Sequence, residues 1–312
     1  MESEGMIQVV REGGLLPLGR PLVSMLSGGR DSVCLLDLAV RLLGADAVTA
    51  LHVNYGLRDD SDEDEAHCAA LCERLEVPLE VERPRRPEGP GNLQAWARDT
   101  RYAAAAQLAQ SGDSLIATGH TADDQVETIL YRLASSPSRR ALLGMRPRDG
   151  KLVRPLLPFT REQTTAYCEE QGLTWRDDPT NDEAAYARNR VRHGLARALA
   201  DVHPAAAQNV LRTAELLRDE AEVLDALVSA ELDGSNGSPR GTIELDRLAE
   251  LPPALRRLVV QQLADRAAGR PVAGAARHAE KVAALRRTGT AMLDLGGGVR
   301  AIAERGTLRA ER

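Results

Sequence analysis

A short polar turn, Ser27-Gly28-Gly29-Arg30-Asp31-Ser32, has the residue types of an anion-binding site. One apolar run ends before it at Leu26 and another begins after it at Val33, which predicts a buried strand, a glycine turn and a helix. Glycine lets the backbone approach a ligand closely, and the unpaired N–H groups at the start of a helix favour phosphate. The alternative is an ordinary turn in which Asp31 and Ser32 cap the helix.

The turn is not the common nucleotide-binding loop, because no lysine follows the glycines and the pattern G-x-x-x-x-G-K-S/T does not occur in the chain. The carboxylate of Asp31 would repel a bare phosphate. A divalent cation such as Mg²⁺ between the carboxylate and the phosphates removes this conflict. The sequence therefore predicts a site for a phosphate-bearing ligand and Mg²⁺ at this turn.

Three acidic residues, Asp123, Asp124 and Glu127, follow the pair Gly119-His120 near the start of a predicted helix. The helix is indicated by apolar residues at helical spacing, which are Val126, Ile129, Leu130 and Leu133. Three carboxylates so placed repel one another unless they hold a cation, either Mg²⁺ or an ammonium group. The alternative is that they are solvated acids favoured by the helix dipole.

Two sets of residues containing arginine have the spacing of a single helix face. Gln94, Arg98 and Arg101 follow one stripe of a predicted helix, and Arg188 and Arg192 are one turn apart in another. The planar guanidinium fork suits phosphate groups, so Arg188 and Arg192 could hold phosphate or an RNA backbone. The alternative is that these arginines are solvated surface residues.

Apolar segments with strand character alternate with helical segments over the first half of the chain. These segments are 21–26, 47–54, 79–83, 114–120 and 152–157. The alternation predicts an α/β fold with an open, mainly parallel sheet and helices on both faces, in which ligands bind outside the carboxyl ends of the strands. We expect the glycine turn, His52 and His120 to lie along that edge.

The chain has 312 residues and an apolar fraction of 43%, which predicts two domains with full cores. The pattern becomes mostly helical after residue 195 and ends in a hairpin, so we predict domains of 1–195 and 196–312. Four cysteines without a C-x-x-C pair and the lack of a secretory signal or long apolar stretch indicate a reducing cytoplasm and no membrane. The net charge of −6 argues against a wholly basic nucleic-acid-binding surface.

Taken together, these motifs resemble the tRNA(Ile)-lysidine synthetases of the N-type ATP pyrophosphatase (PP-loop) superfamily. The matching pieces, in chain order, are 27–32, 52–58, 92–102, 119–133, Arg154-Pro155-Leu156-Leu157, Asp178-Pro179-Thr180-Asn181 and 188–192. The first piece marks the superfamily, and the ordered set is specific to the lysidine enzymes. The resemblance covers about residues 20–195 and implies a Rossmann-like PP-loop domain followed by a smaller, mostly helical domain.

The resemblance implies a two-step ligation. ATP first adenylates the wobble cytidine of a CAU-anticodon tRNA(Ile) and releases pyrophosphate. The amine of L-lysine then displaces AMP at C2, which changes decoding from AUG to AUA. The implied partners are this tRNA and lysine, and a homodimer is left open.

The resemblance also implies a role for individual residues of this chain. Those expected to bind ATP are Ser27, Gly28, Gly29, Arg30, Asp31, Ser32 and His52. Those expected to act in catalysis are Asp31, Asp124, Glu127, His120, Arg98 and Arg101. Asp124 and Glu127 are expected to bind lysine, Asp31 and Asp124 to hold Mg²⁺, and Arg188 and Arg192 to bind tRNA.

The chain departs from the family pattern at three places. Tyr55 stands where the family usually has a second histidine, Gln94 where it usually has glutamate, and residues 135–138 lack the usual glycines. Three alternatives are a tRNA thiolation enzyme of the same superfamily, a non-catalytic RNA-binding relative and an amidotransferase-type synthetase. The cysteine spacing argues against the first, the intact acids against the second, and the absence of a glutaminase cysteine context against the third.

Overall fold

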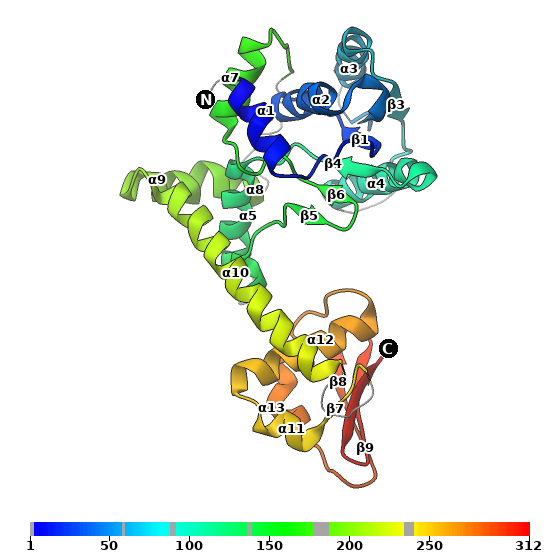
Figure 1. The fold of residues 1–312 in the computed structure, drawn as a ribbon, viewed down its shortest axis with the longest axis vertical. Helices are drawn as coiled ribbons and strands as arrows, with labels where there is room; N and C mark the ends of the chain where they lie inside the picture. The colour runs from blue at the N-terminus through cyan, green and yellow to red at the C-terminus, as the bar shows by residue number, and fades with distance from the viewer. Residues whose placement is uncertain (1–2, 58–59, 88–91, 136–138, 177–186, 234–239) are drawn as a thin grey trace. The chain divides into compact units, whose positions relative to one another are not determined.

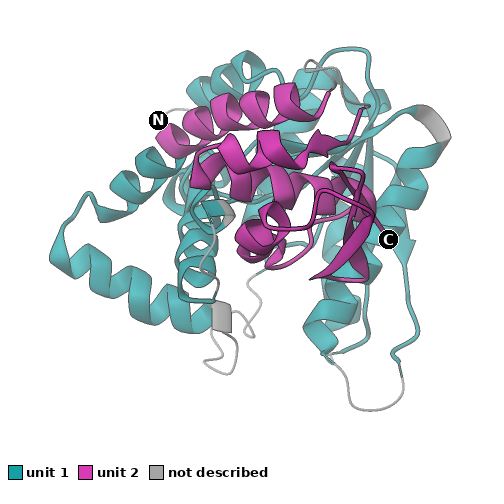
Figure 2. Ribbon diagram, turned by 90° about the horizontal axis from the view of Figure 1, so that it is seen from below, with its two compact units in different colours: residues 1–214 teal, residues 215–312 magenta. Residues whose placement is uncertain are grey.

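The computed structural model describes residues 3–57, 60–87, 92–135, 139–176, 187–233 and 240–312. The chain forms two compact units, Met1–Ala214 and Glu215–Arg312, which Figure 2 shows in different colours. The division falls inside helix α10 (Ala206–Leu232), whereas the sequence pattern placed it after residue 195. The intervening segment goes with the first unit because Leu199 and Val210 pack against Val126 and Leu130.

A six-stranded sheet forms the centre of the first unit, in the order β3-β2-β1-β4-β6-β5. The strands are β1 (Leu22–Met25), β2 (Val48–Val53), β3 (Leu79–Glu82), β4 (Leu115–Ala117), β5 (Arg148–Asp149) and β6 (Leu152–Val153). All neighbours are parallel except β5 and β6, and Leu22 of β1 is in register with Val48 and Leu115 on either side. The predicted α/β class and mainly parallel sheet are confirmed.

Helices cover both faces of this sheet (Figure 1). The helices of the first unit before α10 are α1 (Ser3–Glu12), α2 (Arg30–Leu43), α3 (Ser61–Leu75), α4 (Leu93–Leu108), α5 (Ala122–Ser135), α6 (Arg139–Leu142), α7 (Arg161–Glu170), α8 (Ala187–Arg190) and α9 (Arg197–Val202). Leu22 faces a core shared with α1, α2, α3 and α7, whereas its neighbour Val23 faces α4 through Ala105 and Ala109. The strand is therefore buried on both sides, as its continuous apolar sequence predicts.

Three local details differ from the sequence prediction. The strand predicted over 152–157 ends at Val153, because the following Arg154-Pro155 turns the chain away from the sheet. The antiparallel edge strand β5 was missed, since two residues carry too little pattern to detect. In α5, Val126, Ile129 and Leu130 are buried as predicted, but Leu133 is 58% exposed.

The second unit packs helices against a small antiparallel sheet in the order β7-β10-β9-β8. Its elements, after the second part of α10, are β7 (Ile243–Glu244), α11 (Leu245–Glu250), α12 (Pro253–Ala268), α13 (Ala279–Ala283), β8 (Thr290–Gly296), β9 (Val299–Glu304) and β10 (Thr307–Glu311). The predicted hairpin is confirmed as β8 and β9, whose turn contains Gly297 and Gly298 at positive φ. β7 and β10, which the pattern did not indicate, complete the sheet. In the described part of the chain, no helix has the length and apolarity needed to cross a membrane.

Candidate active site

The turn between β1 and α2 holds its shape through its own hydroxyl groups. The Ser32 hydroxyl donates to the carbonyl oxygen of Gly29 over 2.7 Å and accepts from the main-chain N–H of Ser27 over 3.1 Å. Gly28 has a φ of +83°, a conformation that side chains with a Cβ rarely adopt. The predicted order of strand, glycine turn and helix is confirmed.

The turn presents main-chain donors where an anion would bind. Gly29 is the N-cap of α2, so Arg30 and Asp31 are the first residues whose N–H groups have no acceptor one turn earlier in the helix. These donors lie at the positive end of the helix dipole. The geometry is therefore that of an oxyanion or phosphate site.

The carboxylate of Asp31 is held at the edge of this site, with its side chain 21% exposed. Its Oδ1 accepts a hydrogen bond from the Thr164 hydroxyl over 2.6 Å and from the Arg30 Nε over 3.1 Å. The end of β4 approaches the same turn so closely that a Cβ on Gly119 would lie 2.8 Å from the Asp31 carbonyl oxygen. Only glycine fits there without moving the backbone of Asp31.

Asp124 and Glu127 lie side by side in α5 and share a single cation. Arg161 donates from one guanidinium nitrogen to Asp124 Oδ1 over 2.6 Å and from the other to Glu127 Oε1 over 2.9 Å. Arg192 donates to the same Glu127 oxygen over 2.9 Å. Since the Glu127 side chain is only 3% exposed, its charge depends on these two partners.

The pKa of Arg161 is shifted by its burial and by the neighbouring carboxylates. Burial lowers the pKa of a guanidinium, but the charges of Asp124 and Glu127 outweigh this effect and raise the pKa of Arg161 above its ordinary value. The third acid, Asp123, accepts a hydrogen bond from the main-chain N–H of Arg161 over 2.7 Å. All three predicted acids therefore contact one residue of α7, and the acid pair is built to bind positive charge.

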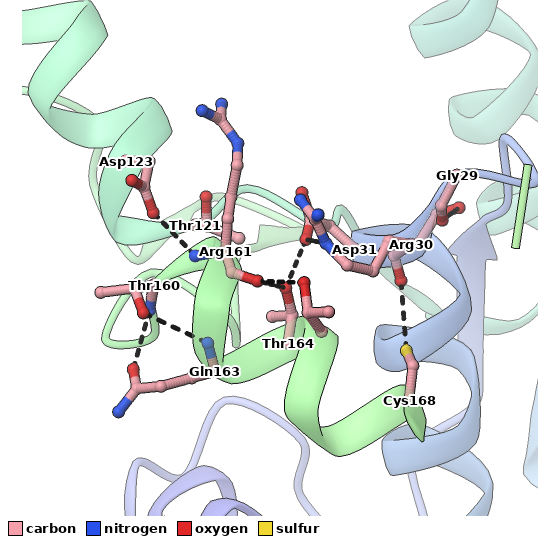
Figure 3. A network of polar contacts seen from close by, with 12 residues as sticks. Gly29, Arg30, Asp31, Thr121, Asp123, Thr160, Arg161, Gln163, Thr164 and Cys168 are labelled. Carbon is pink, nitrogen blue, oxygen red and sulfur yellow. Dashed lines mark hydrogen bonds and ion pairs between the residues drawn. The ribbon is translucent and has the colours of Figure 1, made fainter. Parts of the chain in front are cut away.

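The first turn of α7 connects the two halves of the site. Figure 3 shows its contacts with Asp31 through Thr164 and with Asp123 through the main chain of Arg161. Thr164 contacts Asp31 of α2, and Arg161 contacts the acids of α5. The start of the helix is fixed by a capping box between Thr160 and Gln163. The sequence analysis did not assign Arg161 or Thr164, and the pattern Thr-x-x-Gln is the one local signal that marks this helix start.

His52 lies beneath the glycine turn rather than at its surface. Its ring is 4% exposed, and Nδ1 lies 3.0 Å from the Leu26 carbonyl oxygen and 3.4 Å from Cys68 Sγ. Cys68 Sγ in turn lies 3.4 Å from the point where a Cβ on Gly28 would be. His52 therefore supports the turn from behind, and its predicted contact with ATP is untested. His120 lies at the end of β4, with Nδ1 2.7 Å from the Thr118 hydroxyl.

The predicted arginines fall in three places. Arg192 joins the acid pair through Glu127. Arg98 and Arg101 lie in α4 on the other face of the sheet, and the Arg98 guanidinium stacks 4.8 Å above the Tyr102 ring. The side chain of Arg188 and residues 136–138 and 178–181 lie outside the described part, so the predictions that rest on them are untested.

The residues present fit a Mg²⁺ ion that also contacts phosphate. Mg²⁺ in nucleotide sites typically takes one or two carboxylates and completes its coordination with phosphate oxygens and water. Asp31 supplies a carboxylate beside the main-chain donors, whereas both Asp124 oxygens already accept hydrogen bonds from Thr121 and Arg161. Within the described residues no group of three or more acidic, histidine or cysteine side chains is arranged to hold a metal ion by itself.

A doubly covered parallel sheet whose central strand ends in this glycine turn defines a PP-loop domain. Residues 17–199 match the family model for the PP-loop domain, an ATP-binding family. A relative from Salinispora arenicola, a tRNA(Ile)-lysidine synthase, is 36% identical over 312 residues, which cover 94% of this chain and 91% of the relative. The chain belongs to the tRNA(Ile)-lysidine synthase family.

Other relatives of the same name are longer. The one from Pseudomonas fluorescens is 40% identical over 213 residues, covering 66% of this chain and 48% of the relative. The one from Thermus thermophilus is 40% identical over 262 residues, covering 81% of this chain and 50% of the relative. The chain thus spans about half the length of these two relatives.

A solved structure shares the fold alone. The U34-tRNA thiolase from Methanococcus maripaludis has a TM-score of 0.57 and 17% identity, covering 69% of this chain and 78% of the thiolase. All four cysteines of the present chain are buried and free of disulfides. Burial raises the pKa of Cys72 to about 11 and, with the charges of Cys72 and nearby acids, that of Cys68 to about 12. These thiols are therefore protonated near neutral pH and poorly suited to carry sulfur.

Proposed function

We propose that this protein uses ATP to join lysine to C2 of the wobble cytidine in a CAU-anticodon tRNA(Ile), forming a carbon–nitrogen bond. One observation carries the proposal. The first turn of α7 ties the phosphate-binding turn, through Asp31, to an acid pair that already binds guanidinium cations. A triphosphate and an amino acid with cationic groups are the ligands that suit these two halves.

In the first proposed step, the cytidine O2 attacks the α-phosphorus of ATP and pyrophosphate leaves. The N–H groups of Arg30 and Asp31 would hold the pyrophosphate and stabilise its developing charge. Mg²⁺ held by Asp31, with Asp124 as a second ligand, would supply further charge neutralisation when bound. Arg98 and Arg101 would contact the adenylate or an RNA phosphate.

In the second proposed step, the lysine amine attacks C2, loses a proton, and AMP leaves. Asp124 and Glu127 would bind the ammonium groups of lysine in place of part of their contact with Arg161. His120 stays a candidate for catalysis beside them. Arg188 and Arg192 would help to position the tRNA, and both substrates favour a cytoplasmic enzyme.

The test incubates the purified protein with ATP, labelled lysine and a tRNA(Ile) transcript with the CAU anticodon. We expect ATP-dependent label in the tRNA, which Asp31→Ala and Glu127→Ala abolish. Asp46→Ala is the matched control, because Asp46 is an exposed acid before the amino end of β2, away from the carboxyl edge of the sheet. Label that enters without ATP, or sulfur that enters in place of lysine, would contradict the proposal.

A further inference from the structure

Three arginines outside the acid pair lie near one another in the first unit. Arg132 and Arg154 donate to carbonyl oxygens two residues apart, and both are within electrostatic reach of Arg98. Arg98 of α4 stacks over the Tyr102 ring at 4.8 Å. Arg154, directly after β6, lies close enough to Tyr102 for the phenol to affect its pKa. Arg132 of α5 lies close enough for the charge of Arg98 to reach it. We call Arg98, Arg132 and Arg154 the arginine cluster.

Arg154 lies at the carboxyl edge of the sheet, and α4, which carries Arg98, covers the face opposite α2. Arg154 follows the last residue of β6, which is parallel to β4. The N-terminal half of α4 reaches the same edge, since the Tyr55 hydroxyl just beyond β2 donates to the Ala97 carbonyl oxygen over 2.7 Å. The cluster is therefore near the edge of the sheet where the glycine turn lies, and none of its residues belongs to that turn.

The arginine cluster carries positive charge that is not held in ion pairs by the described residues. Within the described residues, none of the three arginines forms an ion pair, whereas Arg161, Arg176 and Arg192 each pair with a carboxylate. Burial and, more weakly, the charge of Arg98 lower the pKa of Arg132. Burial and Arg98 also lower the pKa of Arg154, against the opposing effects of Tyr102 and the charge of Asp149.

A structural role accounts for part of this arrangement. Arg132 donates to the Gly144 carbonyl oxygen and Arg154 to the Arg146 carbonyl oxygen, both over 2.6 Å, and these bonds anchor the segment before β5. They use one nitrogen of each guanidinium, which has five N–H donors in all. Arg154 is only 6% exposed, and its Nε is buried without a hydrogen-bond partner. A donor left in this state normally indicates a missing acceptor.

We propose that Arg98, Arg132 and Arg154 form a phosphate site that binds a backbone phosphodiester of the RNA substrate next to the reacting base. Phosphate oxygens are the acceptors that match several convergent guanidinium forks. The cluster shares no residue with the glycine turn, so a phosphate bound there would be additional to the pyrophosphate. The identity of the RNA rests on the proposed function, and the phosphate chemistry rests on the cluster itself.

The test measures binding of the tRNA(Ile) transcript across a salt series for Arg98→Gln, Arg132→Gln and Arg154→Gln in the full chain. We expect each change to weaken binding about tenfold and to reduce the salt slope by about one, because one phosphate contact is lost. The KM for ATP should stay unchanged in Arg132→Gln and Arg154→Gln. Arg74→Gln is the matched control, because Arg74 is exposed in α3 and also donates to a single carbonyl oxygen, that of Gly172.

Three results would overturn or redirect the inference. Equal tRNA affinity and salt slope in Arg98→Gln, Arg132→Gln and the control would overturn it. A raised KM for ATP with unchanged tRNA binding would assign the cluster to the nucleotide and refute the RNA site. If Arg154→Gln fails to fold, the other two variants still decide the question. If the wild-type protein transfers no lysine but the variants still bind tRNA more weakly than the wild type, the proposed function alone is refuted.

Discussion

The close approach of β4 to the glycine turn gives a sharp quantitative prediction for Gly119→Ala. The new Cβ would lie 2.8 Å from the Asp31 carbonyl oxygen, 2.9 Å from its carbonyl carbon and 3.1 Å from the Ser32 nitrogen. Ordinary contact needs about 3.4 Å, so the backbone must separate by about 0.6 Å. All three atoms belong to the main chain, which cannot rotate out of the way as a side chain can.

The displacement should reduce both stability and turnover. Inserting one methyl group into a tight backbone contact costs about 1–3 kcal/mol of unfolding free energy. Because a misplacement of about 1 Å can cost about 100-fold in rate, a shift of about half that size should cost about tenfold in lysine transfer. The KM for ATP should rise as well, since Asp31 and its N–H group move.

The assay compares urea unfolding and ATP-dependent lysine transfer of Gly119→Ala with those of Gly194→Ala. A Cβ on Gly194 meets nothing within 4 Å, and its backbone is helical. Alanine there should be neutral or stabilise the protein by up to about 1 kcal/mol. If Gly119→Ala matches this control in both measurements, the close approach is absent and the reasoning about Asp31 fails. A loss of stability with full turnover would refute the part about positioning.

Three further predictions concern the network around α7 and the thiols. Thr164→Val removes the hydroxyl that donates to Asp31, so the free energy of unfolding in urea should fall by about 1.5–3 kcal/mol and the KM for ATP should rise. Wild-type values in both measurements would show that this hydrogen bond is dispensable. Arg161→Met leaves Asp124 and Glu127 with less positive charge, so the free energy of unfolding should fall by about 2–4 kcal/mol. The loss should be smaller than for breaking a fully buried ion pair, because Arg192 still contacts Glu127. Arg161→Lys should recover part of that loss, and equal stability of the two variants would contradict the ion-pair explanation. The pKa of Cys68 is about 12 and that of Cys72 about 11, and all four cysteines are buried, so the native protein at pH 8 should not react with a disulfide reagent. After denaturation all four thiols should react. Rapid labelling of the native protein would refute the burial of these cysteines.

Local features of the site could be predicted from the sequence, and distant contacts could not. The turn at 27–32 was predicted because its flanking apolar runs and glycines determine its conformation within a few residues. The grouping of Asp123, Asp124 and Glu127 followed from helical spacing alone. The burial of His52 could not be predicted in this way. In a strand that is buried on both faces, the sequence pattern does not show whether the last side chains point into the core or to the surface.

The residues that the sequence analysis missed act across long separations. Arg161 contacts acids 34 and 37 residues earlier, and Thr164 contacts Asp31 across 133 residues. Arg192 was assigned from the sequence, and its predicted contact with tRNA stays untested, but its contact with Glu127 across 65 residues was not predicted. Such pairings depend on how the helices pack on the sheet, which residue spacing does not specify.

If the proposed function holds, the shared first turn of α7 has a consequence for any attempt to change which amine the protein accepts. Arg161 and Thr164 belong to one rigid helical turn, so reshaping the acid pair to suit another cation also displaces the carboxylate beside the triphosphate. Altered amine preference and impaired nucleotide use would then arise together from single substitutions. Redesign would have to proceed by paired changes on α5 and α7, selected together for both substrates.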